Sequence, residues 1–351
     1  MTRQITINEF LQLSDPVALI DVRTPAEFAQ GHVPHAFNIP LFTNEERVQV
    51  GTTYKQVGRE QAILLGFDLT GPKWSGFIKL ALEIAPDKKV AVHCWRGGMR
   101  SGAMAWALGL YGFDVLIITG GYKNYRRWAH AQFEKDYPLC VLGGMTGSGK
   151  TKILKQLVAM GEQVIDLEEL AQHQGSSYGS MNKLVQPTQE QFENDLALQL
   201  FRMDSARPIW VEDESLTIGT RAVPNNLWRQ IRESALINLK VPVETRVEAL
   251  VAEYGPLDKD FLITCTDRIR KRLGPEQTKN AIIAINEGRM ADFIRTVLHY
   301  YDKTYFSGLQ KRAAEKVFTL ELAGAGMLNN AQAVLNFANQ IELPVNGHDG
   351  N

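Results

Sequence analysis

The chain has 351 residues, with 38 basic and 39 acidic side chains and a formal net charge of -1. A near-neutral chain does not bind a polyanion through its overall charge, so any nucleic-acid contact has to come from a local basic patch. Its three cysteines lack CxxC spacing and clustered histidine partners, which argues against a zinc site or a disulfide framework and predicts a cytoplasmic protein. We expect no signal peptide and no membrane span, and the length predicts two domains.

Strands alternate with helices through the first part of the chain. Short apolar runs at 18–23, 37–40, 89–92 and 115–118 predict buried strands, with helical segments at 25–28, 74–84 and 102–108 between them. The alternation predicts an α/β fold with a parallel sheet and helices on both faces. Asp21 and Arg23 are expected to pair and brace the neighbouring loop, and His93 is expected to pack at a strand end.

The stretch from His93 to Ser101 places a cysteine between a predicted strand and a predicted helix. Backbone N–H groups of such a loop, together with the helix dipole, form an anion cradle, to which Gly97 and Gly98 belong. Arg96 and Arg100 favour the thiolate form of Cys94. A thiolate beside an anion site can take sulfur, selenium or a phosphoryl group from an anionic donor. The alternative, an inert packed cysteine, does not explain two glycines and two arginines around it.

Residues 5–130 resemble the rhodanese family. The matching residues are Asp21-Val22-Arg23, Glu27-Phe28, Gly31-His32-Val33, Ala36-Phe37-Asn38-Ile39-Pro40, the Cys94 loop, Gly120-Gly121 and Trp128. The resemblance implies a cysteine that carries a persulfide among backbone N–H donors. Five residues separate Cys94 from Arg100, whereas a typical single-domain rhodanese has four; five is the spacing of rhodanese-related cysteine phosphatases. The wider loop predicts a larger tetrahedral anion, such as a phosphate-bearing donor.

A second anion site follows the predicted strand at 139–142. Residues 144–151 match the pattern G-x4-G-K-T between a strand and a helix, as a P-loop requires. Gly144, Gly147 and Gly149 let backbone N–H groups close around phosphate oxygens. Lys150 adds a positive charge, and Thr151 can hold Mg²⁺.

Acidic and polar residues follow in three further segments. A strand predicted at 164–168 carries Asp166 near its end, and a strand at 209–215 ends in three carboxylates. Glu212 or Asp213 is expected to orient Mg²⁺ or water, unless the cluster is only an acidic surface. Ser176 and Ser177 lie in a glycine-bounded loop that is suited to hydrogen-bonding a substrate or is simply a turn.

From Asn225 onward the 3.6-residue period predicts helices. We therefore divide the chain into a rhodanese-like domain at 1–136, a P-loop core at 137–223, a helical region at 224–343 and a disordered tail at 344–351. Basic residues that share a predicted helix face or lie at the domain junction are candidates for RNA phosphate contacts, or are only solvated: Arg268, Lys271, Arg272, Arg126 and Arg127.

The pairing of a rhodanese-like half with a P-loop half, with the motifs at 166–168, 175–179 and 211–215, resembles the tRNA 2-selenouridine synthase family. The resemblance implies a transferase that converts wobble 2-thiouridine of tRNA to 2-selenouridine through S-geranyl-2-thiouridine. It implies that the P-loop holds the diphosphate of geranyl diphosphate, and that Cys94 takes selenium from selenophosphate as a transient selenenylsulfide. It implies the tRNA anticodon arm as partner, no membrane and no tightly bound cofactor, with Mg²⁺ as a candidate ion. We expect a monomer.

Two other functions remain open at this stage. A cysteine phosphatase or arsenate reductase takes the His-Cys-x5-Arg pattern at face value but leaves the P-loop half unexplained. A P-loop kinase with a sensory rhodanese domain predicts ATP turnover that does not change in Cys94→Ala.

Overall fold

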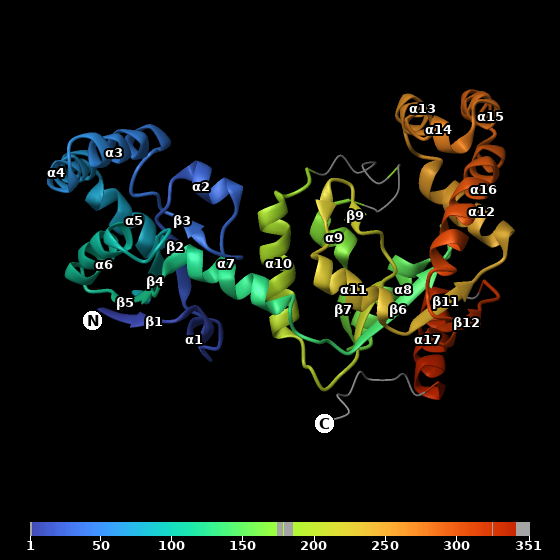
Figure 1. Ribbon diagram of the computed structural model, residues 1–351, viewed down its shortest axis with the longest axis horizontal. Coiled ribbons are helices and arrows are strands. Elements are labelled where there is room, and N and C mark those ends of the chain that lie inside the picture. The colour runs from blue at the N-terminus through green and yellow to red at the C-terminus, as the bar shows by residue number, and fades with distance from the viewer. Residues whose placement is uncertain (1, 174–177, 179–184, 325, 342–351) are drawn as a thin grey trace. The chain divides into compact units, whose positions relative to one another are not determined.

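The computed structural model describes residues 2–173, 178, 185–324 and 326–341 (Figure 1). The chain forms two compact units, the first made of residues 1–132 and 188–198 and the second of residues 133–187 and 199–351. The division lies near the predicted boundary at 136, and the segment 188–198, which we assigned to the P-loop core, clusters with the first unit. The predicted tail at 344–351 lies outside the described residues.

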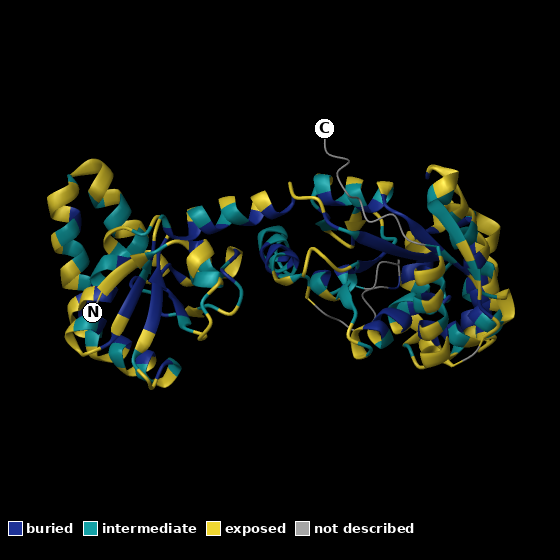
Figure 2. Ribbon diagram, turned by 90° about the horizontal axis from the view of Figure 1, so that it is seen from below, coloured by how far each residue is buried: buried dark blue, intermediate teal, exposed yellow. Residues whose placement is uncertain are grey.

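The first unit contains a five-stranded parallel sheet with the order β1-β5-β4-β2-β3. Its strands are β1 (Thr2–Ile5), β2 (Ala18–Asp21), β3 (Phe37–Asn38), β4 (Lys89–His93) and β5 (Asp114–Ile118). The middle strand β4 is buried from Val90 to His93, and the middle strands of both sheets are mainly dark blue in Figure 2. Apolar runs of this kind suit a sheet that helices cover on both faces. The predicted α/β fold is confirmed.

Seven α-helices and one 3₁₀ turn belong to the described part of the first unit: α1 (Ile7–Leu11), α2 (Pro25–Gln30), α3 (Asn44–Gln56), α4 (Arg59–Thr70), η1 (Gly71–Lys73), α5 (Trp74–Ile84), α6 (Met99–Leu110) and α7 (Gly121–Gln132). Helix α2 begins where the sequence predicts, because the Thr24 hydroxyl accepts the N–H of Glu27 and Pro25 follows the cap. Helix α6 begins at Met99, earlier than the predicted Gly102, which places Arg100 and Ser101 in its first turn.

The hairpin of α3 and α4 has little contact with the core of the first unit. Helix α3 buries none of its residues, and α4 buries only Ala62 and Thr70. The two helices pack against each other, and a capping box of Thr43 with Glu46 fixes the start of α3. An apolar surface on this hairpin therefore stays open to solvent.

The second unit contains another five-stranded parallel sheet, with the order β12-β11-β6-β8-β7, and a small antiparallel hairpin. Its strands are β6 (Leu139–Gly144), β7 (Gln163–Ile165), β8 (Ile209–Glu212), β9 (Thr217–Ile218), β10 (Arg221–Ala222), β11 (Leu236–Lys240) and β12 (Val317–Glu321). The prediction of an all-helical region at 224–343 is wrong at β11 and β12. Both are short apolar runs between helices, and periodicity over so few residues does not separate a buried strand from a helical turn.

The helices of the second unit, together with α10, which joins the two units, are α8 (Lys150–Ala159), α9 (Leu167–Ala171), α10 (Gln189–Arg202), α11 (Asn225–Glu233), α12 (Val243–Tyr254), α13 (Lys259–Arg268), α14 (Arg270–Leu273), α15 (Pro275–Asn286), α16 (Met290–Leu309), η2 (Ala314–Lys316) and α17 (Met327–Gln340). Leu167 and Glu168 begin a helix instead of ending the predicted strand, because the Asp166 side chain caps α9. Among the described helices, none combines the length and the apolar character that a bilayer span needs.

Candidate active sites

Cys94 lies directly after β4 and is buried, with 4% of its surface exposed. The N–H of Gly98 donates to its Sγ at 3.3 Å, and the Ser101 hydroxyl lies 3.4 Å from the same atom. Burial disfavours the thiolate, but the hydrogen bonds from Ser101 and the loop, with the charge of Arg100, outweigh burial and hold the pKa of Cys94 below its ordinary value. The thiol is therefore prepared to act as a nucleophile.

The N-terminus of α7 fixes the orientation of the cysteine loop. The N–H groups of Tyr122 and Lys123 donate to the carbonyls of Cys94 and Trp95, each at 2.9 Å. Gly121 makes this approach possible, since a Cβ there would lie 2.2 Å from the Cys94 carbonyl oxygen, and its φ is +56°. The carbonyls of Cys94 and Trp95 thus point toward α7.

A buried charged pair supports the loop from the neighbouring strand. The guanidinium of Arg23 donates to both carboxylate oxygens of Asp21 and to the Gly31 carbonyl, and it lies 3.7 Å from the centre of the Tyr122 ring. The predicted pairing of Asp21 with Arg23 is confirmed. His93 is buried as predicted, and burial lowers its pKa, which favours the neutral imidazole.

The two loop arginines have different surroundings. Arg100 is held by Glu27, with nitrogen–oxygen distances of 2.7 and 3.2 Å. Arg96 is exposed and lines a cavity beside the loop. Of the predicted anion-loop residues, Gly97 has a φ of +65° and Gly98 caps α6, so the sulfur, the loop N–H groups and Arg100 form one site.

The P-loop joins β6 to α8. Gly147 and Gly149 lie in the turn with positive φ, and Gly144 ends the strand. The Lys150 ammonium donates to the Gly144 carbonyl at 2.9 Å and lies 3.4 Å from Glu212. The Thr151 hydroxyl donates to Glu212 at 3.1 Å. Glu212 thus contacts both the lysine and the hydroxyl of the P-loop motif.

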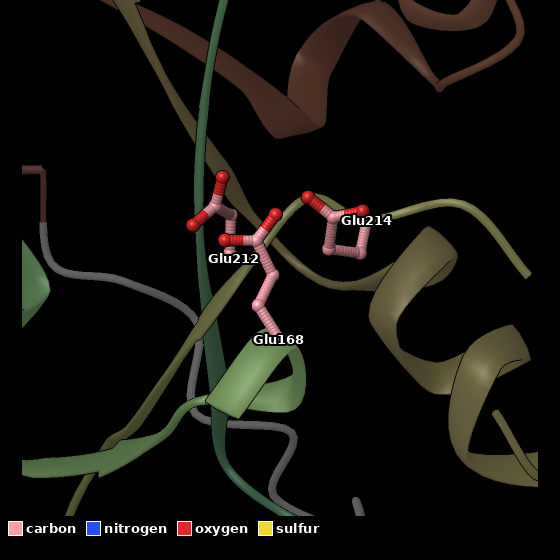
Figure 3. A group of neighbouring side chains, drawn as sticks. All are labelled: Glu168, Glu212 and Glu214. Atoms are coloured by element: carbon pink, nitrogen blue, oxygen red, sulfur yellow. The ribbon is translucent and has the colours of Figure 1, made fainter. Parts of the chain in front are cut away.

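Three carboxylates converge near the end of β8 (Figure 3). One oxygen each from Glu168, Glu212 and Glu214 lies within 4.8 Å of the others. Burial, with the charge of Glu212, raises the pKa of both Glu168 and Glu214. Burial opposes the Lys150 charge, but the surrounding glutamates outweigh it and raise its pKa. The raised pKa values favour the protonated forms of Glu168 and Glu214 when no cation is bound.

The donor atoms of this site fit Mg²⁺. Carboxylate oxygens of Glu168, Glu212 and Glu214 and the hydroxyl of Thr151 are hard oxygen ligands. A divalent cation would also relieve the repulsion that raises the carboxyl pKa values. Among the described residues, these three glutamates and Thr151 could therefore hold the ion.

Sequence reasoning missed Glu168 and Glu214 and selected two neighbours with other roles. Asp166 accepts the N–H of Glu169 as a helix cap, and Asp213 pairs with Arg232 and Arg312. Strand β8 ends at Glu212, and the N–H of Glu214 turns back to donate to the Glu212 carbonyl at 2.9 Å. This turn, which the sequence pattern does not specify, leaves Glu212 and Glu214 close together while Asp213 pairs with the arginines. Ser176 and Ser177 lie outside the described residues.

Of the basic residues that are candidates for RNA contacts, one is bound to other side chains of the protein and the others are exposed. Arg126 is bound to Glu193 and donates to the side chain of Asn194 at 2.6 Å, whereas Arg127 is exposed. The expectation of a single helix face for the C-terminal group is wrong, because α13 ends at Arg268 and α14 starts after Ile269. All three basic residues of that group are exposed nevertheless: Arg268, Lys271 and Arg272.

Arg246 is a positioning residue to which no sequence motif points. Its guanidinium is buried, pairs with Asp302 through two bonds of 2.8 Å, and donates to the Thr146 carbonyl of the P-loop at 3.2 Å. It lies 100 residues from that carbonyl in sequence. Only the folded chain brings them together.

The fold and the two sites define a rhodanese-like unit fused to a P-loop unit. A family model described as "tRNA 2-selenouridine synthase AAA domain" matches residues 137–325, and a rhodanese-like domain model matches residues 6–127. The chain is 39% identical over 300 residues to the tRNA 2-selenouridine synthase of Marinobacter nauticus, covering 77% of this chain and 78% of the relative.

Two further relatives with the same name match more of the chain. The relative from Sulfurovum sp. is 35% identical over 86% of this chain and 91% of its own length. The relative from Hydrogenovibrio crunogenus is 34% identical over 92% of this chain and 95% of its own length. The chain belongs to the tRNA 2-selenouridine synthase family.

Proposed function

We propose that this chain replaces the sulfur of wobble 2-thiouridine in tRNA with selenium in two stages. A geranyl group from geranyl diphosphate is first transferred to the sulfur, and selenium from selenophosphate then displaces the geranylated sulfur. The observation that carries the proposal is the presence in one chain of a thiolate-stabilising anion loop and a P-loop beside three carboxylates. Neither the phosphatase nor the kinase alternative uses both sites.

The first stage is assigned to the P-loop. The sulfur attacks C1 of geranyl diphosphate, the carbon–oxygen bond breaks, diphosphate leaves, and the N3 proton of the uridine passes to solvent. The P-loop N–H groups and Lys150 bind the diphosphate and stabilise the charge that develops on it. Mg²⁺, when bound, supplies further positive charge to the leaving group. The stage needs no ATP hydrolysis.

The second stage begins at Cys94. The thiolate attacks phosphorus of selenophosphate, the phosphorus–selenium bond breaks, and selenium leaves as hydrogen selenide with a proton from water. Water then hydrolyses the phosphocysteine to phosphate. We favour phosphorus over selenium as the point of attack, because the selenenylsulfide route would expel phosphite and thus reduce phosphorus by two electrons. The loop N–H groups and Arg100 hold the phosphoryl oxygens.

Hydrogen selenide completes the exchange at C2 of the S-geranylated uridine. The carbon–selenium bond forms and the carbon–sulfur bond breaks. Of the two protons of hydrogen selenide, one leaves with geranethiol and the other restores the N3–H of the uridine. Proteins read single-stranded RNA by contacting splayed bases, which suits a wobble base in the anticodon arm. The exposed Arg127, Arg268, Lys271 and Arg272 are proposed phosphate contacts. We propose a cytoplasmic monomer without a tightly bound cofactor.

Reconstitution with an anticodon stem-loop that carries 2-thiouridine tests this function. The purified chain receives geranyl diphosphate and Mg²⁺, followed by selenophosphate, and mass spectrometry follows the nucleosides. We expect S-geranyl-2-thiouridine first and 2-selenouridine second, with ³¹P NMR showing phosphate as the phosphorus product. Phosphite would overturn the attack on phosphorus. Turnover of phosphate esters or ATP without modification of the RNA would overturn the proposed function.

A further inference from the structure

A cavity of about 990 Å³ opens in the first unit beside the Cys94 loop. Its walls come from α3, α4, the start of α5 and the first turns of α6. Arg96 and Arg100 belong both to the loop and to the lining of the cavity. A molecule bound at the cysteine loop can therefore extend directly into this cavity.

Most of the lining is apolar, and part of it is exposed. Leu41, Phe42 and Ala62 are buried at the base. Val48 and Phe67 contribute to the walls with 67% and 55% of their surfaces exposed. Large apolar side chains gathered around a hollow are typical of a binding site for an apolar group.

Among the described residues, every charged one in the lining is a cation. These residues are Arg47, Lys55, Arg96 and Arg100, and no aspartate or glutamate that the structure describes lines the cavity. Arg100 is paired with Glu27, whereas no carboxylate of the described chain lies within ion-pair distance of the other three. The cavity is thus complementary to an apolar chain attached to an anionic molecule.

We propose that this cavity holds the isoprenoid chain of the S-geranylated nucleoside during the selenium stage, while the cationic residues contact the adjoining RNA phosphates. This inference rests on the proposed function. The chain is attached to the leaving sulfur, so it has to lie next to C2 when C2 faces Cys94. Each buried CH₂ strengthens binding about fourfold, equivalent to about 0.8 kcal/mol, so burial of the chain positions the nucleoside.

Free geranyl diphosphate is assigned to the other unit. Mg²⁺ stabilises a diphosphate leaving group, so the donor site should contain ligands for this ion. Among the described residues, the cluster of carboxylates suited to Mg²⁺ lies at the P-loop and consists of Glu168, Glu212 and Glu214. The cavity beside Cys94 has cations in its lining, and none of its described lining residues carries a carboxylate. Its chemistry suits the geranylated product of the first stage better than the diphosphate donor.

The test uses pairs of matched variants on the exposed hairpin. Phe67→Asp and Val48→Asp place a carboxylate in the cavity wall. Leu64→Asp and Val57→Asp change residues that are 64% and 67% exposed on the same hairpin and do not line the cavity. All four positions are exposed, and circular dichroism with thermal melting checks that each full-length variant is folded.

Selenium transfer is measured on synthetic stem-loops that carry S-geranyl- or S-methyl-2-thiouridine, with selenophosphate as donor. We expect the two cavity variants to lower kcat/KM for the S-geranyl substrate at least tenfold and to stay within twofold of wild type on the S-methyl substrate. The two control variants should match wild type on both. Geranylation of 2-thiouridine by all four variants should be unchanged.

Other results overturn the inference in distinguishable ways. Equal losses on both substrates would show that the wall contacts RNA and not the chain. Loss of geranylation in the cavity variants would assign the cavity to free geranyl diphosphate, and wild-type rates in those variants would show that the chain does not enter it. Failure of the wild-type protein to transfer selenium to the S-geranyl substrate would overturn the proposed function and this inference with it.

Discussion

The cysteine loop and the P-loop occupy equivalent places in their units but have opposite electrostatics. Each follows the middle strand of a five-stranded parallel sheet, β4 or β6, and each leads into a helix, α6 or α8. Donors around Cys94 lower the pKa of its thiol, whereas burial and the charge of Glu212 raise the pKa of Glu168 and Glu214 beside Lys150.

The difference shows how one backbone arrangement serves two kinds of chemistry. Strand ends and helix N-termini supply N–H donors in both loops. The neighbouring side chains differ between the loops. Those around Cys94 stabilise a negative charge on the protein itself, whereas the glutamates beside the P-loop favour the binding of a cation. The first loop is thus suited to a protein nucleophile, and the second to a diphosphate with its metal ion.

The largest expected effect is that of Cys94→Ala. Removal of a nucleophile typically costs about a thousandfold or more in rate, so 2-selenouridine formation should be lost. Geranylation should stay at the wild-type rate, because Lys150 and its surroundings are intact. Nucleoside mass spectrometry of the reconstituted reaction should show accumulated S-geranyl-2-thiouridine. An equal loss of geranylation would mean that the two loops do not work separately.

Lys150→Ala should produce the complementary defect. Loss of one preorganised charge on a developing anion lowers kcat by about 10²- to 10³-fold, and here the affected step is geranylation. Selenium transfer to a synthetic S-geranyl stem-loop should be unchanged. Lys152→Ala is the matched control, since Lys152 is an exposed residue in the first turn of the same helix. If both steps fail in Lys150→Ala, the division of labour is wrong.

Ser101→Ala tests whether the Ser101 hydroxyl lowers the pKa of the Cys94 thiol. The Ser101 hydroxyl lies 3.4 Å from the Cys94 Sγ, and its hydrogen bond helps to lower the pKa of the thiol. Since a hydrogen bond to a charged group contributes about 1.5 kcal/mol, alkylation by iodoacetamide at pH 6 should slow roughly tenfold. Burial raises the pKa of Cys140 and Cys265, which serve as internal controls. An unchanged pH–rate profile would contradict the role of Ser101.

The smallest effect concerns stability at the carboxylate site. Folding raises the pKa of Glu168 and Glu214, so the folded chain binds more protons than the unfolded chain above the ordinary carboxyl pKa. Stability of the metal-free protein should therefore fall as the pH rises from 6 to 9. We expect a decrease of about 3 °C in the melting temperature of the second unit in EDTA, which Mg²⁺ or Glu214→Gln should reduce. A melting temperature that rises over this range would contradict the predicted carboxylate repulsion.

Features built from consecutive residues could be predicted from the sequence. The strand, glycine-rich loop and helix that form each anion site are contiguous, so Cys94, Lys150 and Thr151 could be assigned from their positions. The Asp21–Arg23 pair spans only two residues. Local geometry fixes such groups, and tertiary packing then orients them.

Features that depend on distant segments could not be predicted. Strands β11 and β12 form by pairing in a sheet that reaches from Leu139 in β6 to Glu321 in β12. Arg126 donates a hydrogen bond to Asn194, which lies 68 residues away in the sequence, so this contact could not be predicted from neighbouring residues. The cavity beside Cys94 needs the α3–α4 hairpin to lie next to α6, and no local pattern specifies that arrangement.

Mass spectrometry of bulk tRNA nucleosides tests the separate use of the two loops most directly. Cells that lack the protein are complemented with wild type, Cys94→Ala or Lys150→Ala. The account predicts 2-selenouridine with wild type, S-geranyl-2-thiouridine without 2-selenouridine in Cys94→Ala, and plain 2-thiouridine in Lys150→Ala. Normal 2-selenouridine in cells that lack the protein would contradict it.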